Sequence, residues 1–269
     1  MTAKTPVIPS ARLIEVFSAI QGEGHNVGTR QIFIRFALCD LRCHFCDSAH
    51  TWHVPKTCRI EQTPGLRDFE IYSNPVPLPI LLQSIKQQNL PALHDSISIT
   101  GGEPLLHAAF LVEFLPQLRS VTGLPVYLET GGHRPEELAM ILPHINSVGM
   151  DFKLPSVSGE RRWQEHTKFL QLCHDSLREV FVKIIVSNKT DLADLERSAD
   201  VVAAISPSIK VFLQPVTPLE STDSTTQNPT QEIIVAPSPE QVLSWQALMK
   251  RTLKDVRVIP QTHKMLNQL

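Results

Sequence analysis

The sequence lacks the features that mark three large classes of protein. It has no run of about 18 uninterrupted apolar residues, so nothing in it predicts a membrane span. Its first residues lack the long apolar segment of a secretory signal peptide, and five cysteines, three of them close together, do not suit a secreted disulfide framework. With 25 Lys and Arg against 27 Asp and Glu and no basic run, it lacks the signature of a nucleic-acid binder. We therefore expect a cytoplasmic protein that binds neither a membrane nor nucleic acid.

Alternating strand and helix patterns predict an α/β fold. The length of 269 residues and the apolar fraction of 42% suit one large domain with a substantial core. The predicted parallel strands cover 30–37, 96–100, 126–130, 147–152, 180–187 and 209–214, and an earlier strand covers 12–18. The predicted helices fall near 78–90, 105–119, 135–143, 160–176, 190–204 and 238–253. This order predicts a parallel sheet with helices outside, and it leaves a doubly wound sheet open as an alternative.

Two stretches interrupt this rhythm. Residues 49–79 are dotted with proline and show no clear periodicity, so we expect an irregular insertion there. Residues 218–231 are rich in Ser, Thr and Gln and read as a polar surface loop. No domain boundary or internal repeat is visible, so we expect residues 1–269 to form a single domain.

Three cysteines within eight residues form the strongest chemical signal. Cys39, Cys43 and Cys46 follow a predicted strand, and thiolates are soft ligands that select zinc, copper(I) or iron–sulfur clusters. A closed structural zinc site needs four ligands, and the chain has no second Cys-x2-Cys pair. A four-iron cluster held by three cysteines leaves one iron free to bind a substrate or cofactor.

The spacing Cys-x3-Cys-x2-Cys resembles the cluster motif of the radical S-adenosylmethionine enzymes. The resemblance implies that Cys39, Cys43 and Cys46 hold a [4Fe-4S] cluster whose open iron chelates S-adenosylmethionine. An electron from the cluster then cleaves the sulfonium to give methionine and a 5′-deoxyadenosyl radical. The residues leave open a zinc site completed by one of three nearby histidines, His44, His50 or His53.

Motifs at the ends of later strands also resemble this superfamily. Thr100-Gly101-Gly102-Glu103-Pro104 is similar to its GGEP element, whose glycines allow close backbone approach and whose carboxylate suits an ammonium group. Asp151-Phe152-Lys153 ends another strand, where barrels of this kind place their ligand contacts. The resemblance implies that the following residues contact S-adenosylmethionine: Gly101, Gly102, Glu103, Asp151, Phe152 and Lys153.

The N-terminal part is similar to one family within the superfamily. Phe17-Ser18-x-x-Gln21-Gly22-Glu23-Gly24, then Phe33-x-Arg35-Phe36, the cysteines and Cys46-Asp47-Ser48 resemble the signature of the 7-carboxy-7-deazaguanine synthase family. The resemblance implies a partial TIM barrel of about six parallel strands. It also implies a lyase that converts 6-carboxy-5,6,7,8-tetrahydropterin to 7-carboxy-7-deazaguanine with release of ammonia, on the way to queuosine. Hydrogen abstraction at C6 would begin the ring contraction, and S-adenosylmethionine would be regenerated.

The alternative is another radical enzyme, such as a glycyl-radical activating enzyme. It would keep the cysteines and Gly101-Gly102-Glu103-Pro104 but would not need Gln21-Gly22-Glu23-Gly24.

The family resemblance also implies substrate and metal contacts. Arg35 is a planar fork suited to a carboxylate, and Gln21 and Glu23 suit the amide and amine edges of a pterin. The implied substrate residues are Ile20, Gln21, Gly22, Glu23, Arg35 and Thr100. Ser48 stands where the family pattern commonly has threonine, and its hydroxyl implies a Mg²⁺ ligand. A flavodoxin-like electron donor and a homodimer are implied as well.

Further polar residues sit at or in strands. Lys183 lies inside an apolar strand, where a lysine is costly unless it faces a polar cavity. Gln214 ends the sixth strand and can close the cofactor pocket, whereas His263 in the C-terminal tail is expected to cap a surface turn. Cys58 lies outside the cluster spacing, and Cys173 is expected in the core.

The cysteine assignment predicts the outcome of three substitutions. Cys43→Ala should abolish the iron–sulfur absorbance, because two thiolates cannot hold the cluster. Cys58→Ala and Cys173→Ala are the matched controls and should keep it. Iron content and visible absorbance after anaerobic reconstitution measure the result. A full complement of iron in Cys43→Ala, or its loss in either control, would mean that the wrong three cysteines were chosen.

Overall fold

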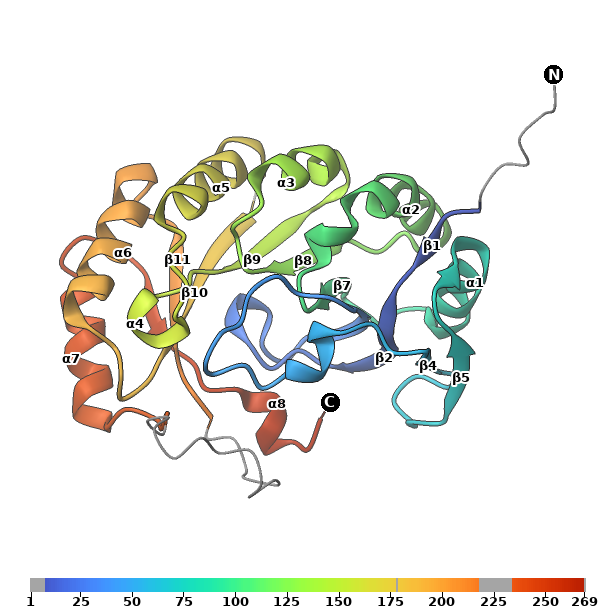
Figure 1. Cartoon of the computed structure of the whole chain (residues 1–269), viewed down its shortest axis with the longest axis horizontal. Helices are drawn as coiled ribbons and strands as arrows, with labels where there is room; N and C mark the ends of the chain where they lie inside the picture. The colour runs from blue at the N-terminus through green and yellow to red at the C-terminus, as the bar shows by residue number, and fades with distance from the viewer. Residues whose placement is uncertain (1–7, 178, 218–233, 269) are drawn as a thin grey trace.

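An open sheet of ten strands organises the part of the chain that the computed structural model describes, which is residues 8–177, 179–217 and 234–268 (Figure 1). The strand order is β12-β11-β10-β9-β8-β7-β3-β2-β4-β5. The strands are β2 (Leu13–Ile20), β3 (Arg30–Phe36), β4 (Thr57–Glu61), β5 (Phe69–Ser73), β7 (Ser96–Gly101), β8 (Val126–Thr130), β9 (Ser147–Asp151), β10 (Glu179–Val186), β11 (Lys210–Pro215) and β12 (Val256–Val258). A separate pair joins β1 (Ser10–Ala11) to β6 (Val76–Pro77).

The six predicted parallel strands are present as β3 and β7 to β11. Each pairs in parallel with its neighbour in the sheet. The short strand β12, which was not predicted, adds a seventh parallel strand beside β11. On the other side of β3, β2 pairs antiparallel to it, and β4 then pairs in parallel with β2. The result is an α/β fold with a large, mostly parallel sheet that does not close, so the partial TIM barrel stays a prediction.

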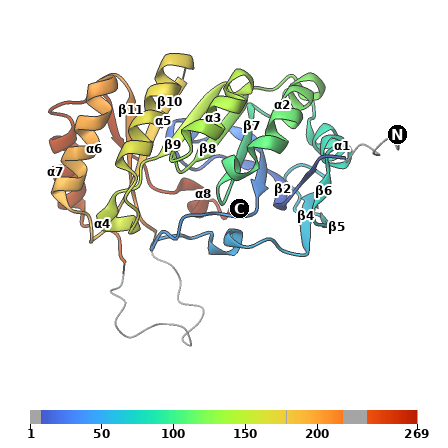
Figure 2. The same ribbon diagram turned by 45° about the horizontal axis from the view of Figure 1, so that its top comes forward.

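Helices cover the outer face of this sheet. In Figure 1 α1, α2, α3, α5, α6 and α7 follow one another along an outer arc, and the turned view in Figure 2 keeps them in the same order. The helices are α1 (Leu78–Gln88), α2 (Ala108–Thr122), α3 (Pro135–Ile141), α4 (Pro155–Ser158), α5 (Trp163–Ser176), α6 (Leu192–Ile205), α7 (Pro239–Met249) and α8 (Thr262–Met265). Short 3-10 turns lie at Gly24–Asn26, Ala49–Trp52, Pro104–His107 and Leu142–His144. No helix in these described ranges is long and apolar enough to cross a membrane.

The segment 49–79 is not irregular, contrary to expectation. It contains β4 and β5, which form an antiparallel hairpin at the edge of the sheet, and the short strand β6. Residues of β5 are mostly exposed on both faces, so the alternation that reveals a half-buried strand is absent. The predicted polar loop 218–231 lies outside the described residues, and the single-domain organisation stays a prediction.

Strand pleating separates an outer apolar face from an inner polar one. Successive side chains of a strand point to opposite faces, and in β10 Val182, Ile184 and Val186 are fully buried in the main core. The residues that alternate with them, Phe181, Lys183 and Ile185, point to the inner side and line a cavity there. The same alternation in β3, β7, β8, β9 and β11 places one polar residue or more of each strand on this inner side.

Two histidines are buried in neutral form. His166 of α5 is fully buried, and the centre of its ring lies 4.4 Å from the centre of the Phe152 ring. Its Nε2 donates to the Gly131 carbonyl. Burial lowers its pKa to about 3. Burial lowers the pKa of His94 to about 4, and its Nε2 lies 2.8 Å from the Ser18 hydroxyl. A histidine that must stay neutral when folded binds protons more readily when unfolded.

These histidines predict a loss of stability in acid. Both pKa values lie below the unfolded value of about 6.5, so their stabilisation is complete above that pH and is lost as pH falls toward 4 and 3. Between pH 7 and pH 5 the free energy of unfolding should fall by about 2 kcal/mol for His166 alone. His166→Gln should reduce this fall in the free energy of unfolding, because the amide still donates to the Gly131 carbonyl but does not titrate.

Urea unfolding at a series of pH values measures the effect. His53→Gln is the control, because His53 is exposed, and it should follow the wild type. An unchanged acid limb in His166→Gln would show that His166 does not cause the loss.

Candidate active site

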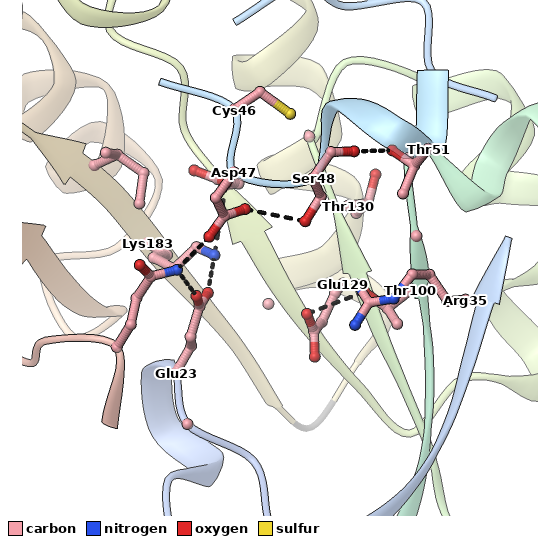
Figure 3. Close-up of a pocket in the computed structure, with 18 of the residues that line it drawn as sticks. Glu23, Arg35, Cys46, Asp47, Ser48, Thr51, Thr100, Glu129, Thr130 and Lys183 are labelled. Carbon is pink, nitrogen blue, oxygen red and sulfur yellow. Dashed lines mark hydrogen bonds and ion pairs between the residues drawn. The ribbon is translucent and has the colours of Figure 1, made fainter. Parts of the chain in front are cut away.

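A cavity of about 470 Å³ opens on the inner side of the sheet, at the carboxyl ends of its parallel strands (Figure 3). Parallel α/β folds of the barrel type place their active sites at this end. The strands supply its floor, the segment that follows β3 supplies one wall, and α8 supplies another. Residues that lie more than 200 positions apart in the chain therefore meet in one place.

The three predicted cluster ligands lie together on the wall that follows β3. We call residues 37–52 the cysteine loop; Cys39, Cys43 and Cys46 all line the cavity as free thiols. The loop closes on itself, because Leu38 N–H donates to the Thr51 carbonyl at 2.7 Å. The Arg42 guanidinium donates to the Cys39 carbonyl, also at 2.7 Å.

This arrangement fits a cluster better than a single metal ion. In the described ranges no three His, Cys, Asp or Glu side chains converge as ligands of one ion. The thiolates of an iron–sulfur cubane bind different irons and need not converge. Burial raises the pKa of Cys39 to about 12 and also raises those of Cys43 and Cys46, so loading with iron must release protons.

The histidines of the zinc alternative are dispersed. His50 lines the cavity, whereas His44 packs against Gly159 at the end of α4 and His53 is exposed.

The glycines after β7 allow this strand to meet the cysteine loop. Gly101 has a φ of +133°, and a Cβ on Gly102 would lie 2.2 Å from the Leu38 carbonyl oxygen and 3.0 Å from the Cys39 Cβ. Only glycine fits such a contact. Both residues line the cavity, but the close approach that they permit is to the chain itself.

Glu103 is fully buried and its carboxylate already has three partners. It accepts from Leu105 N–H at 3.0 Å, from the Thr130 hydroxyl at 2.8 Å and from Gly131 N–H at 2.9 Å. It therefore joins the end of β7 to the end of β8, and it caps the 3-10 turn that directly follows it in the chain. Its predicted contact with S-adenosylmethionine stays a prediction.

A second contact ties the cysteine loop to the segment after β8. Asp40 accepts from His133 Nε2 at 3.0 Å and from the Arg134 guanidinium at 2.8 Å. The Arg134 guanidinium and His133 hold the pKa of Asp40 well below its usual range. This carboxylate, which lies beside the first cysteine, is thus a fixed anchor for the loop.

The end of β9 separates three residues that were predicted to act together. Asp151 and Lys153 line the cavity and form an ion pair at 2.7 Å, and the burial of Lys153 is offset by Asp151, which raises its pKa. Phe152 points the other way into the core, where its ring packs against Trp163 and His166. Strand pleating thus turns the Phe152 side chain away from the cavity, and the predicted cofactor contact of this residue stays a prediction.

The turn after β2 supplies Ile20, Gln21, Gly22 and Glu23, which all line the cavity. The Gln21 amide is already used within the chain: it donates to Glu129 at 2.6 Å and to Gln31 at 3.1 Å, and it accepts from Glu23 N–H. Gln21 thus orients Glu129 and leaves no free amide donor for a ligand. Glu23 pairs with Lys183 and accepts from Gln261 at 2.7 Å.

Arginines give one side of the cavity a positive charge. Arg35 Nε donates to buried Glu15 at 2.8 Å, and Arg59 reaches the other oxygen of Glu15 at 2.6 Å. Two guanidinium groups around one carboxylate leave a net positive charge. In the described ranges the remaining donors of the Arg35 fork have no partner, so they are available to an anion. Thr100, on the neighbouring strand, donates to Glu129 at 3.2 Å.

Ser48 presents oxygen to the cavity beside Asp47. Its hydroxyl donates to Asp47 at 3.0 Å (Figure 3), and it does not cap the 3-10 turn that follows. Asp47 also accepts from Gln261 at 2.9 Å and from Lys264 at 3.0 Å. These partners hold the pKa of Asp47 below its usual range. A hydroxyl and an ionised carboxylate are the hard oxygen ligands that Mg²⁺ prefers.

The cavity contains Glu129, to which the sequence analysis assigned no role, and Lys183, which was expected to face a polar cavity. Glu129 is held by Gln21, Ser98 and Thr100, and burial raises its pKa. Lys183 faces the polar cavity, as expected, because burying a lysine among the apolar residues of a strand is costly. Glu129 occupies an inner position of β8 as Lys183 does in β10, so the alternation that pointed to Lys183 would also have pointed to Glu129.

The C-terminal segment forms one side of the cavity. It lies far along the chain from the residues that it contacts, so no local sequence pattern reveals this role. A Cβ on Gly22 would lie 2.3 Å from His263 Nδ1, and Thr262 N–H donates to the Gly22 carbonyl at 3.0 Å. His263 therefore lines the cavity and does not merely cap a surface turn. Gln214 lines it as predicted, whereas Cys58 and Cys173 are buried in the core.

Comparisons with known proteins agree with this site. Residues 20–151 match the model of a 4Fe-4S single cluster domain. The 7-carboxy-7-deazaguanine synthase of Geobacter sulfurreducens is 43% identical over 97% of this chain and 99% of its own length. The protein of the same name from Archaeoglobus fulgidus is 32% identical over 95% of this chain and 98% of its own length.

Solved structures share the fold. QueE from Escherichia coli superposes with a TM-score of 0.59 at 21% identity and covers 94% of both chains. A structure described as native anSMEcpe with bound AdoMet and a Cp18Cys peptide gives 0.53 at 13% identity, over 82% of this chain and 60% of the other.

Three cysteines in the loop after β3 of an open α/β sheet, the match to a 4Fe-4S single cluster domain and the similarity to these synthases together define a radical S-adenosylmethionine enzyme. The full-length similarity then identifies the family. The chain belongs to the 7-carboxy-7-deazaguanine synthase family. A glycyl-radical activating enzyme, the alternative from the sequence, is not favoured.

Proposed function

We propose that this chain converts 6-carboxy-5,6,7,8-tetrahydropterin to 7-carboxy-7-deazaguanine and ammonia, in the route to queuosine. The observation that carries the proposal is one cavity that holds three free thiols, a positive arginine fork and an ionised glutamate. Full-length similarity to synthases of this name supports it. The bound cluster and S-adenosylmethionine supply the radical that abstracts the substrate hydrogen.

The chain's own residues bind, orient and shelter the substrate. The free donors of Arg35 suit the pterin carboxylate, and Glu23 suits the N–H and amine edge of the ring. Glu129, with its raised pKa, is placed to exchange a proton with the substrate during loss of ammonia. His263 and Lys264 of α8 add to the cavity wall beside Glu23 and Asp47.

The cofactor residues divide between two walls. Cys39, Cys43 and Cys46 would hold the cluster, and Gly101, Gly102 and Asp151 face the space beside it. Lys153 reaches the same space and its ammonium lies 5.1 Å from the centre of the Phe45 ring. These residues suit the charged methionine end of S-adenosylmethionine.

Mg²⁺, a homodimer, a flavodoxin-like electron donor, a cytoplasmic location and a partial-barrel arrangement of the strands are part of the same proposal. For Mg²⁺ the supporting feature is the oxygen pair of Ser48 and Asp47 on the cavity wall. For the others, the family membership is the support.

Anaerobic incubation with carboxytetrahydropterin, dithionite and S-adenosylmethionine tests the function directly. Mass analysis should find 7-carboxy-7-deazaguanine and one ammonia for each pterin consumed. Consumption of S-adenosylmethionine with the pterin unchanged would overturn the proposal.

Arg35→Lys should weaken pterin binding. Lysine keeps the charge and the pairing with Glu15, but it loses the planar fork that holds a carboxylate at two points. Breaking such a pair in a desolvated site should cost about 2–5 kcal/mol of binding free energy, while cluster content and uncoupled cleavage of S-adenosylmethionine persist. Arg30→Lys is the matched control, because Arg30 lies on the same strand but contacts Ser18 and Pro64 outside the cavity. Equal pterin affinity in Arg35→Lys and wild type would assign Arg35 to the scaffold.

Magnesium should stimulate turnover through Ser48. Mg²⁺ often takes few protein ligands and fills its octahedron with water and substrate oxygens, and here it would orient the pterin. Ser48→Ala should weaken the stimulation without loss of the cluster. Ser48→Thr, which keeps the hydroxyl, should retain it and is the control. Turnover across a magnesium titration measures both variants. Identical curves for wild type and Ser48→Ala would remove Ser48 from the metal site.

A further inference from the structure

Lys183 is a partly buried cation, with 17% of its side chain exposed, that none of the roles described above uses. It lies on the inner face of β10, and its ammonium contacts Glu23 from the turn after β2 and lies 3.6 Å from Asp151 at the end of β9. Asp151 pairs in turn with Lys153 at 2.7 Å. Charges therefore alternate across the cavity, from Glu23 on the predicted substrate side to Lys153 on the predicted cofactor side; Figure 3 shows the Glu23 and Lys183 part of this chain.

Both oxygens of Glu23 have a partner in the chain. Lys183 contacts Oε2, and the Gln261 amide donates to Oε1 at 2.7 Å. A carboxylate has about four lone-pair sites, so two remain for a ligand. Their direction is set by the two groups that hold the carboxylate.

Most of the other titratable groups around Glu23 are acidic. The groups that act on it besides Lys183 are Asp47 from the cysteine loop, Tyr127 and Glu129 from β8 and His263 from α8, while Asp151 from β9 lies 3.6 Å from the Lys183 ammonium. Burial and the nearby carboxylates favour the neutral form of Glu23, and Lys183 is the main opposing group. The balance lowers the pKa of Glu23 because of Lys183 and the Gln261 amide.

We propose that Lys183 is a positioning residue for substrate recognition: its ammonium keeps Glu23 ionised and aimed into the cavity, so that Glu23 can accept two hydrogen bonds from the pterin. The inference rests on the proposed function. A protonated Glu23 would present a donor to the ring N–H or amine and leave a buried donor unpaired, which weakens binding. Without Lys183 the pterin should therefore bind well only at high pH.

Anaerobic calorimetry with 6-carboxytetrahydropterin tests this, on enzyme loaded with cluster and S-adenosylmethionine, from pH 5.5 to 8.5. Loss of the ammonium in Lys183→Gln should raise the pKa of Glu23. Below that raised pKa, the pterin Kd of the variant should rise by up to about tenfold for each pH unit. Lys183→Arg, which restores the charge, should follow the wild type. The double variant Glu23→Gln/Lys183→Gln should bind weakly at every pH and lose the dependence.

Lys210→Gln is the matched control. Lys210 lies on the neighbouring strand β11 and contacts His25 at 3.1 Å and Glu179 at 3.7 Å, away from the cavity lining. It should keep the wild-type affinity and pH profile. A wild-type pH profile in Lys183→Gln would overturn the role of Lys183 while leaving the proposed function intact. A wild-type enzyme that binds no pterin would overturn both.

Proton release on binding gives a second test, which stands even if Lys183→Gln fails to fold. At pH 6, calorimetry in two buffers of different ionisation enthalpy counts the protons released when the pterin binds. Wild type and Glu23→Gln should release the same number, because Glu23 is already ionised. One extra proton released by the wild type would show that Glu23 starts neutral and would contradict the proposal.

Discussion

One buried carboxylate holds the functional end of this fold together. Glu103 accepts from the start of the turn after β7, from the Thr130 hydroxyl at the end of β8 and from Gly131 N–H. Its own backbone N–H donates to the Leu38 carbonyl in the cysteine loop at 2.8 Å. A hydrogen bond contributes about 0.5–1.5 kcal/mol, so the positions of the two strand ends depend on this side chain, while its backbone N–H ties the cysteine loop to the same place.

Charge pairing then divides the cavity into two functional sides. Arg35 and Arg59 share Glu15 and leave one side positive, as binding of a carboxylate requires. On the other side Lys183 sits between Glu23 and Asp151. Buried ion pairs add little net stability, so their place at the strand ends is better explained by ligand orientation than by folding.

Much of this fold follows from strand pleating, which the sequence displays directly. The apolar residues of β3 and β7 to β11 gave the six parallel strands, and the polar residues between them line the cavity. The same alternation separates Asp151 from Phe152, although the motif suggested that they act together. The edge strand β5 was missed because an exposed strand has no apolar face to detect.

Long-range contacts account for the features that the sequence did not reveal. Gln261 bridges Glu23 and Asp47, and no periodicity relates residues that lie so far apart in the chain. The glycines of the GGEP element were expected to approach a ligand, but Gly101 lies against Phe36 at the end of β3 and Gly102 against Leu38 in the cysteine loop. Such roles depend on which segments meet in space.

The fate of the C6 hydrogen tests the central claim most directly. Carboxytetrahydropterin deuterated at C6 would be incubated anaerobically with reduced enzyme and S-adenosylmethionine, and the recovered compounds analysed by mass. A radical lyase of this family should yield 7-carboxy-7-deazaguanine and ammonia, with deuterium recovered in S-adenosylmethionine. Deazaguanine without transfer of deuterium, or cleavage of S-adenosylmethionine without deazaguanine, would contradict the account.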